Sequence, residues 1–167
     1  MLESGTSIKF KHISTNRMKI ISELLKNQRL LKYLTYLNDN PLSGADVNAG
    51  SVLRDNVVLT KFNETILTET KILMFLTTDS IRFSRGRVLD DTIYNLDIVL
   101  PNHKWTIYSN MIERPMAIAD EIAKSIDQQR VAGIGEVWIS AVNTGKVNST
   151  YSFLNLKISV ANATYKR

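Results

Sequence analysis

The sequence predicts an α+β fold: a four-stranded, mainly antiparallel sheet with helices packed on one face. Three observations lead to this prediction. Amphipathic helical patterns stand at 18–37 and 114–126, and pairs of apolar, β-prone segments lie between and after them. The chain has 167 residues and is 44% hydrophobic, which suits one compact domain with a substantial core.

Residues 1–17 lack a periodic pattern and are predicted to form an N-terminal arm or extension, with 18–167 as a single α+β domain. Such an arm could lie ordered on a neighbouring subunit or be a flexible leader. The sequence leaves both interpretations open.

The first helix is predicted from Met18 to Leu37, where leucine and isoleucine recur at three- and four-residue spacing. The pattern breaks near Asn27 and Gln28, which predicts a bend or an interruption. The turn-forming residues NDNPLS at 38–43 are expected to end the helix.

The first hairpin is predicted after a long excursion. Residues 44–70 show no clean period, so we expect an irregular segment with a short helical turn. The apolar run 71–82 predicts a strand covered on both faces, with a bulge or bend at 77–80. A second strand at 92–100 is expected to pair with it in an antiparallel hairpin.

The central helix is predicted to begin at Arg114 and Pro115, because a first helical turn tolerates proline. Residues 103–108 are expected to extend or repeat the preceding strand. Isoleucines and alanines at helical spacing form the apolar face of the helix, whereas Glu121 and its charged neighbours fall on the polar side.

The second hairpin follows a glycine turn at Gly133 and Gly135. Val137 opens an alternating stretch that predicts a strand, and 151–160 alternates in the same way. Asn, Gly and Ser at 143–150 mark the turn between the two strands.

Composition restricts the possible partners. The net charge is +5 and the pI is about 9.5, which favours nucleic acid or an acidic protein surface as a partner. Residues 1–37 are basic and 38–70 are net acidic, an unevenness that suits subunits finding their register, although a solvated basic face is the alternative. The absence of cysteine excludes disulfides and thiolate sites, and no apolar run is long enough for a membrane span, so we expect a cytosolic setting.

Catalytic motifs are largely missing. The glycines of AGIGEV follow a helix and precede a strand, the reverse of the order in a dinucleotide-binding fingerprint. His12 and His103 are too far apart in sequence to indicate a zinc site or a catalytic triad, and no cofactor is expected. A metal-dependent nuclease remains as an alternative, for which the candidate residues are Asp90, Asp91, Asp97, Lys104 and Glu113.

Six residues are candidates for an interface. Three arginines near the first hairpin tip form a possible cationic finger for phosphate or acidic side chains, with solvated loop charges as the alternative; they are Arg82, Arg85 and Arg87. Trp105 is a possible interface anchor, with packing in the core as the alternative. Lys146 and Asn148 lie in the second hairpin loop, where they are expected to reach a neighbouring copy.

A family resemblance covers 18–160. It is carried by a final strand and by five segments before it: MKIISELLKNQRLLKYL, KILMFLTTDSIRF, YNLDIVLP, RPMAIADEIAKSID and GIGEVWISAV. In their order and in the pattern of residues within them, these segments resemble the neck proteins of tailed bacteriophages, in particular tail terminator or tail-completion proteins. The resemblance implies a non-enzymatic virion protein, assembled in the host cytoplasm as a ring that is usually sixfold. Such a ring caps the tail tube and joins it to the head connector.

The resemblance leaves other functions open. Head-completion or adaptor proteins at the same junction have similar sizes. A basic inner wall of the ring would meet genomic DNA transiently and without sequence preference. From outside the family, a small nuclease and a monomeric nucleic-acid or adaptor module are the alternatives.

Overall fold

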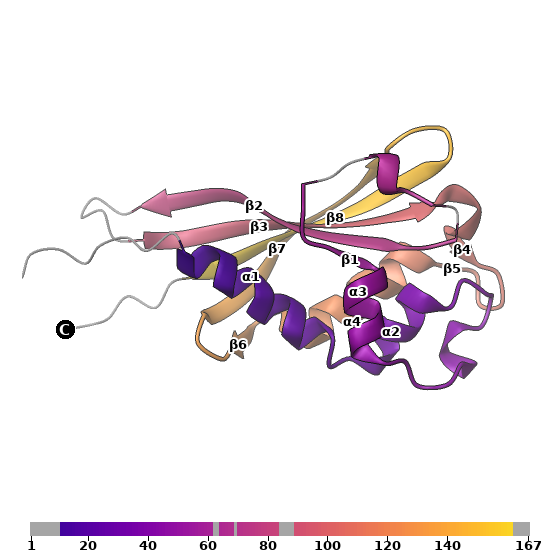
Figure 1. The fold of residues 1–167 in the computed structure, drawn as a ribbon, viewed down its shortest axis with the longest axis horizontal. Helices are drawn as coiled ribbons and strands as arrows, with labels where there is room; N and C mark the ends of the chain where they lie inside the picture. Colours follow the sequence, from indigo (N-terminus) through magenta and orange to yellow (C-terminus); the bar gives the residue numbers. More distant parts are fainter. Residues whose placement is uncertain (1–10, 62–63, 69, 84–88, 162–167) are drawn as a thin grey trace, which may run out of the picture.

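A computed structural model describes residues 11–61, 64–68, 70–83 and 89–161 (Figure 1). The described chain contains four α-helices: α1 (Lys11–Leu24), α2 (Gln28–Thr35), α3 (Ala49–Asp55) and α4 (Arg114–Ile126). Three short 3-10 helices are η1 (Pro41–Ser43), η2 (Glu64–Ile66) and η3 (Asn102–Lys104). The strands are β1 (Val57–Val58), β2 (Leu73–Phe83), β3 (Leu89–Pro101), β4 (Thr106–Ile107), β5 (Ile112–Glu113), β6 (Gln129–Val131), β7 (Gly135–Lys146) and β8 (Tyr151–Ala161).

The main sheet has six strands in the order β1-β2-β3-β8-β7-β6, and it is strongly curled into a half-barrel. It is mixed, because β1 pairs in parallel with β2 while the other neighbours are antiparallel. A separate two-stranded sheet joins β4 and β5. The predicted four-stranded sheet is therefore wrong, since the additional strands are only two or three residues long and too short to show a period.

The two predicted hairpins are confirmed as β2–β3 and β7–β8, and β3 joins β8 at the centre of the sheet. The bulge predicted at 77–80 is present as a register shift between Thr78 and Ser80, and β7 has another between Ile139 and Ala141. Bulges increase local twist, and twist over strands of 11 to 13 residues curls the sheet. The turn predicted at 143–150 is shorter than expected, because β7 continues to Lys146.

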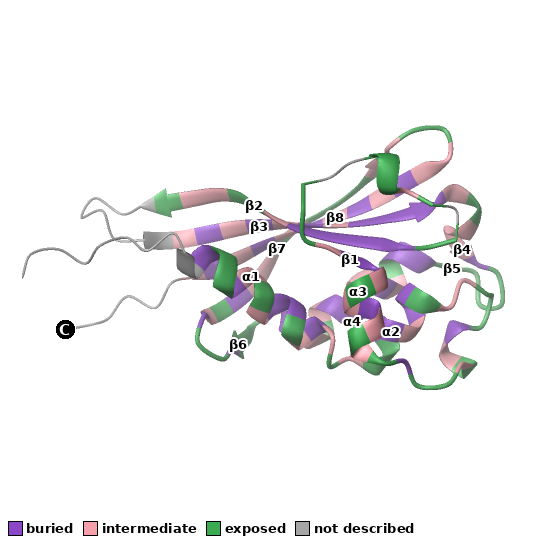
Figure 2. Ribbon diagram, in the orientation of Figure 1, coloured by how far each residue is buried: buried purple, intermediate pink, exposed green. Residues whose placement is uncertain are grey.

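The four helices lie on one face of the sheet, as Figure 1 shows, and this part of the prediction is correct. Alternate residues of the central strands point into the core between helices and sheet, so that β8 alternates strictly between buried and half-buried positions (Figure 2). The core includes Ile20, Leu24, Leu31, Ile72, Leu96, Ile98, Ile118, Ile122 and Leu156. The helix layer and the sheet therefore share one close-packed core.

The opposite face of the sheet is only partly covered. Leu73, Phe75 and Val99 form a smaller core there, and Leu67 packs against it from the segment that follows β1. That segment, with η2, lies above the sheet in Figure 1. The irregular excursion predicted for 44–70 therefore supplies α3 on one face and a cover on the other.

The predicted break in the first helix is confirmed at Asn27. The Asn27 side chain accepts hydrogen bonds from the amides of Arg29 and Leu30 and so caps α2. The helix start predicted at Met18 is wrong, because α1 begins at Lys11. Its first turns offered little apolar periodicity to detect.

Candidate functional site

The predicted cationic finger is described only in part. Arg82 is exposed near the end of β2, opposite Asp91 of β3, while Arg85 and Arg87 lie outside the described residues. Lys146 is exposed at the other end of the sheet, since it pairs with Ser152, which pairs with Leu100 of β3. Along β3 these two ends are about 30 Å apart. Arg82 and Lys146 therefore do not form one surface.

Asn148 shapes the turn of the second hairpin. Its side-chain oxygen accepts hydrogen bonds from the amides of Thr150 and Tyr151 at 2.8 and 3.0 Å. Asn102, just after β3, donates to the Ser149 carbonyl at 2.8 Å and braces the same turn. Asn148 thus has a structural role in this turn, and its predicted contact with a neighbouring copy stays a prediction.

Trp105 is partly buried and packs against the main core. Its carbonyl accepts a hydrogen bond from the Arg114 amide at 2.7 Å, which ties the start of α4 to the segment before β4. These contacts favour the packing interpretation of Trp105.

The nuclease candidates are scattered. Asp91 and Asp97 lie on one face of β3 about 20 Å apart, and Glu113 is exposed on β5. Burial raises the pKa of Asp97, which accepts a hydrogen bond from Asn155 at 2.7 Å. Among the described residues, no group of three or more His, Cys, Asp or Glu is placed to hold a metal ion. The side chain of Asp90 lies outside the described part of the chain.

A feature that the sequence analysis missed is an exposed apolar cluster at the tip of the β4–β5 hairpin. Tyr108 is 63% exposed and Met111 is 75% exposed; Ile112 on β5 and Met116 in the first turn of α4 are exposed as well. We call these four residues the hairpin patch. Met111 has a φ of 57°, a left-handed conformation that is uncommon for a non-glycine residue and that occurs in tight turns.

The hairpin patch stands on a firmly held base. Arg114 is buried at the start of α4, and its guanidinium donates to the carbonyls of Lys104, Tyr36 and Asn38 at 3.1, 2.9 and 2.7 Å. The Ser109 hydroxyl donates to the carbonyl of Asp39. The segment after α2 is therefore tied to the hairpin and to the start of α4 by three hydrogen bonds, and the fourth joins Arg114 to the segment before β4.

The charge of Arg114 is also accounted for. Burial lowers the pKa of this guanidinium, while the negative charge of Asp39 acts in the opposite direction. An arginine stays protonated in proteins at physiological pH, so the three carbonyls face a permanent cation.

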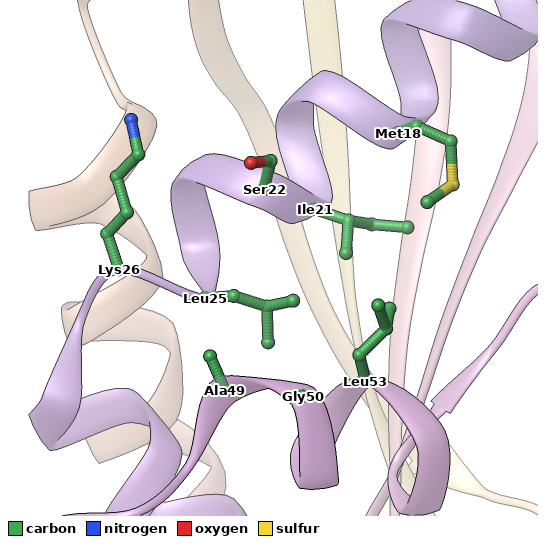
Figure 3. A pocket seen from close by; sticks show the side chains of 8 residues that line it. All are labelled: Met18, Ile21, Ser22, Leu25, Lys26, Ala49, Gly50 and Leu53. Atoms are coloured by element: carbon green, nitrogen blue, oxygen red, sulfur yellow. The ribbon is translucent and has the colours of Figure 1, made fainter.

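A second apolar feature is a groove between α1 and α3, with a volume of about 430 Å³ (Figure 3). We call it the α1–α3 groove. Its lining is Met18, Ile21, Ser22, Leu25, Lys26, Ala49, Gly50 and Leu53. Only Ser22 and Lys26 bring polar side chains, so the groove offers few groups that could orient a polar substrate.

An ionic cluster around one buried carboxylate joins α2 and α4. Glu121, only 3% exposed, contacts Arg29 at 2.9 Å and Lys124 at 3.0 Å, and Asn27 donates to it at 3.2 Å. Burial alone would raise the pKa of Glu121, but hydrogen bonds from Lys124, Arg29 and Asn27 outweigh it and lower the pKa. The placement of Glu121 on a polar face is therefore wrong, and the cluster has a structural role.

No helix in the described ranges is long and apolar enough to cross a bilayer.

Comparison with known proteins gives one family. No curated protein matches the sequence. The family model described as YomW matches residues 27–160, from the cap of α2 to the penultimate residue of β8. The match spans α2, α3, α4 and the whole β-structure up to that point, which is most of the chain. The chain therefore belongs to the YomW family.

Proposed function

We propose that this protein is a structural subunit of the neck of a tailed bacteriophage. In this proposal, copies form a ring, a hexamer by the resemblance, that terminates the tail tube and joins it to the head connector. The subunit is made in the host cytoplasm and ends in the virion, without membrane contact. Its partners are other copies of itself, the tail tube and the head-connector proteins.

The observation that carries this proposal is the hairpin patch. Three large apolar side chains on one hairpin, with Met116 in the first turn of the helix that follows it, are costly to leave in water and favour a protein–protein contact at this place. Tyr and Met are enriched in the cores of such contacts. Because Arg114 and Ser109 hold the hairpin in place, binding would cost little ordering entropy.

The sheet edges are less suited to joining subunits. β1 pairs with only two residues of β2, and β6 pairs with only three residues of β7, so most of both edges is unpaired within the described residues. Each edge, however, carries a bulge and charged residues, such as Asp79 on β2 and Lys146 on β7. Bulges and charges are devices that prevent edge-to-edge pairing. The apolar patch is the better candidate for the lasting contact.

Contact with passing DNA is a subsidiary part of the proposal. The net charge of +5 would favour phosphate, without base recognition. We expect any such binding to weaken steeply with salt. The residues that contact DNA would lie on the inner wall of the ring.

A head-completion or adaptor role at the same junction uses the same kind of contact and is the second candidate. The hairpin patch supports either role, because both need a fixed apolar surface on a rigid subunit. The position of the ring relative to the tail tube separates them. The nuclease has weaker support, since its candidate carboxylates lie apart on β3 and β5.

Cryo-electron microscopy of particles made by the phage that encodes this chain tests the proposal. We expect a ring of density at the head-proximal end of the tail tube into which the fold fits, and unjoined heads and tails when the gene is deleted. As a control, mass spectrometry of purified particles shows whether the protein is present in them. Absence of the protein from particles that are otherwise complete would refute the proposal.

A further inference from the structure

Helix α1 bridges the two ends of the curled sheet. It contacts β2, near one edge, and β6, at the other edge, from the helix-covered face (Figure 1). On one side Arg17 donates a hydrogen bond to the Leu76 carbonyl of β2 at 3.4 Å. On the other side Lys19 donates to the carbonyl of Gly133, in the turn before β7, at 3.0 Å. Residues two apart point to nearly opposite sides of a helix, which suits this bridge.

The contacts that hold α1 are with distant parts of the chain. Ile13, Ile20, Ile21 and Leu24 are at most 5% exposed and belong to the main core. The Tyr94 hydroxyl of β3 donates to the Ile13 carbonyl at 3.0 Å. The three hydrogen bonds between α1 and the sheet join residues that are 59, 81 and 114 positions apart. The site that receives α1 is therefore built almost entirely by the sheet and α4.

The connection from α1 to the rest of the chain is two residues long. α1 ends at Leu24 and Asn27 already caps α2, so Leu25 and Lys26 make the turn, and we call them the α1–α2 link. No glycine or proline occurs from Lys11 to Asn40. Leucine and lysine are good helix formers, so this link can also become helical and join α1 and α2 into one straight helix.

We infer that α1 is exchanged between copies, so that α1 of one copy occupies the α1 site of the next copy. Because every copy has the same sequence, the apolar packing and the three hydrogen bonds of α1 are remade without change on the neighbouring sheet. The occupant of the site is thus a segment of known shape and chemistry. Exchange of an identical element is a low-cost route to an oligomer.

The cost of the exchange is confined to the α1–α2 link. In the single chain the Asn27 side chain accepts hydrogen bonds from the amides of Arg29 and Leu30. In a continuous helix main-chain carbonyls accept from the same amides, so these donors keep a partner. Two arrangements of similar energy that differ in a short link are the condition in which exchange between chains occurs.

This inference deepens the proposed function, and rests on it in one respect: it names the element that neighbouring subunits of the ring would share. Each copy gives its α1 to one neighbour and receives the α1 of the other. The contact is therefore head-to-tail. Such contacts continue until the rotation between neighbours closes a ring.

A crosslink between α1 and its site tests the exchange in the full chain. The sequence has no cysteine, so Lys19→Cys with Ala132→Cys gives one thiol on α1 and one on the exposed turn beside Gly133. A short bismaleimide should join the two thiols. On a denaturing gel, a crosslink within one chain runs as a monomer, whereas exchanged helices give a ladder of joined chains.

We expect this ladder from the oligomer fraction of a size-exclusion column. Lys19→Cys with Ser149→Cys is the matched control and should give no ladder, because Ser149 is equally exposed but lies beyond the other end of β7. Oligomers whose crosslinks all stay within single chains would overturn the inference. A ladder that stops at two chains would overturn the head-to-tail arrangement.

The length of the α1–α2 link provides a second, independent test. Deleting Lys26 should lower the dissociation constant of self-association by about 30-fold or more, because a shorter link does not let α1 return to its own sheet. Inserting Gly-Ser-Gly-Ser-Gly after Leu25 should raise this constant by about 30-fold, because a longer link eases that return. The same insertion after Thr60, in an exposed segment, is the control and should leave the constant unchanged.

Sedimentation equilibrium measures these constants, and circular dichroism checks that each variant is folded. Equal self-association of the deletion and insertion variants would overturn the inference, as would a wild-type protein that stays monomeric up to about 1 mM. These outcomes are separate from those for the proposed function. A neck ring in particles whose α1 crosslinks stay within single chains would refute the exchange alone. Exchange in the purified protein together with its absence from complete particles would refute the neck function alone.

Discussion

Replacing Arg114 by lysine should loosen the base of the hairpin patch. The arginine donates three hydrogen bonds to carbonyls at 2.7 to 3.1 Å from a buried position. A lysine keeps the positive charge but has a single nitrogen, so it cannot reach three carbonyls spread around a planar guanidinium. One or two of the three carbonyls would then lose their hydrogen-bond donor.

The expected cost follows from these contacts. Leaving a buried polar group without a partner costs about 1–3 kcal/mol, so two such carbonyls correspond to about 3 kcal/mol of unfolding free energy. For a chain of this size the urea m-value is about 2 kcal/mol/M, and the midpoint should therefore fall by about 1.5 M. This is a large part of the stability of an ordinary domain.

Urea unfolding followed by circular dichroism measures the effect, with Arg130→Lys as the control. Arg130 is exposed on β6, and no hydrogen bond or ion pair involves its side chain within the described residues, so the control should change the midpoint little. Hydrogen exchange of the amides in 105–113 should also speed up in Arg114→Lys. An unchanged midpoint, or unchanged exchange in the hairpin, would show that the three hydrogen bonds do not hold it.

Three further predictions concern single polar groups. Glu121→Ala should lower the free energy of unfolding in urea at pH 7 by about 2 kcal/mol, which is less than for a fully buried pair because Arg29 and Lys124 are more than half exposed and can regain water. The pKa of Glu121 is lowered in the folded state, so the stability advantage of the wild type should be present above the unfolded pKa of about 4.3 and disappear as the pH falls through the folded pKa. An equal difference in stability at pH 2 and pH 7 would contradict this prediction. The pKa of Asp97 is raised in the folded state, so ionisation of this carboxyl destabilises the fold above the folded pKa, and this destabilisation vanishes below the unfolded pKa. Asp97→Asn should therefore leave the stability at pH 7 unchanged or raise it. A clear fall in melting temperature would count against a raised pKa of Asp97. Thr92→Val should raise the free energy of unfolding by about 1 kcal/mol, because the Thr92 hydroxyl is buried without a hydrogen-bond partner among the described residues. Thermal unfolding measures this change. A lower melting temperature for the variant would show that the hydroxyl has a partner, such as a bound water.

The long, periodic segments were predictable from sequence. The two hairpins, the start of α4 at Arg114 and the break at Asn27 follow from alternation, from a tolerated proline and from an interruption of the helical pattern. These signals are local, so one stretch of chain contains all the information that they need. The strand count failed where pairing depends on distant partners, as for β1, which exists only because it lies beside β2.

The candidate site was much less predictable. Arg114 looked like an ordinary residue before a helical proline, yet two of its three carbonyl partners, on Tyr36 and Asn38, lie more than 70 positions earlier in the chain. Glu121 looked solvent-facing because α4 alone has a polar side, and α2 buries it with Arg29 and Asn27. Such burial is created by tertiary packing, so the apolar periodicity of a single helix does not reveal it.

The part of the chain that matches the YomW family begins at Asn27, and α1 therefore lies before it. Five of the eight residues that line the α1–α3 groove come from α1 and the residues just after it. A relative that shares the matched region but has a different leading helix would keep the α3 wall of this groove and change the opposite wall, so the groove can differ between relatives in which the sheet and α4 are the same.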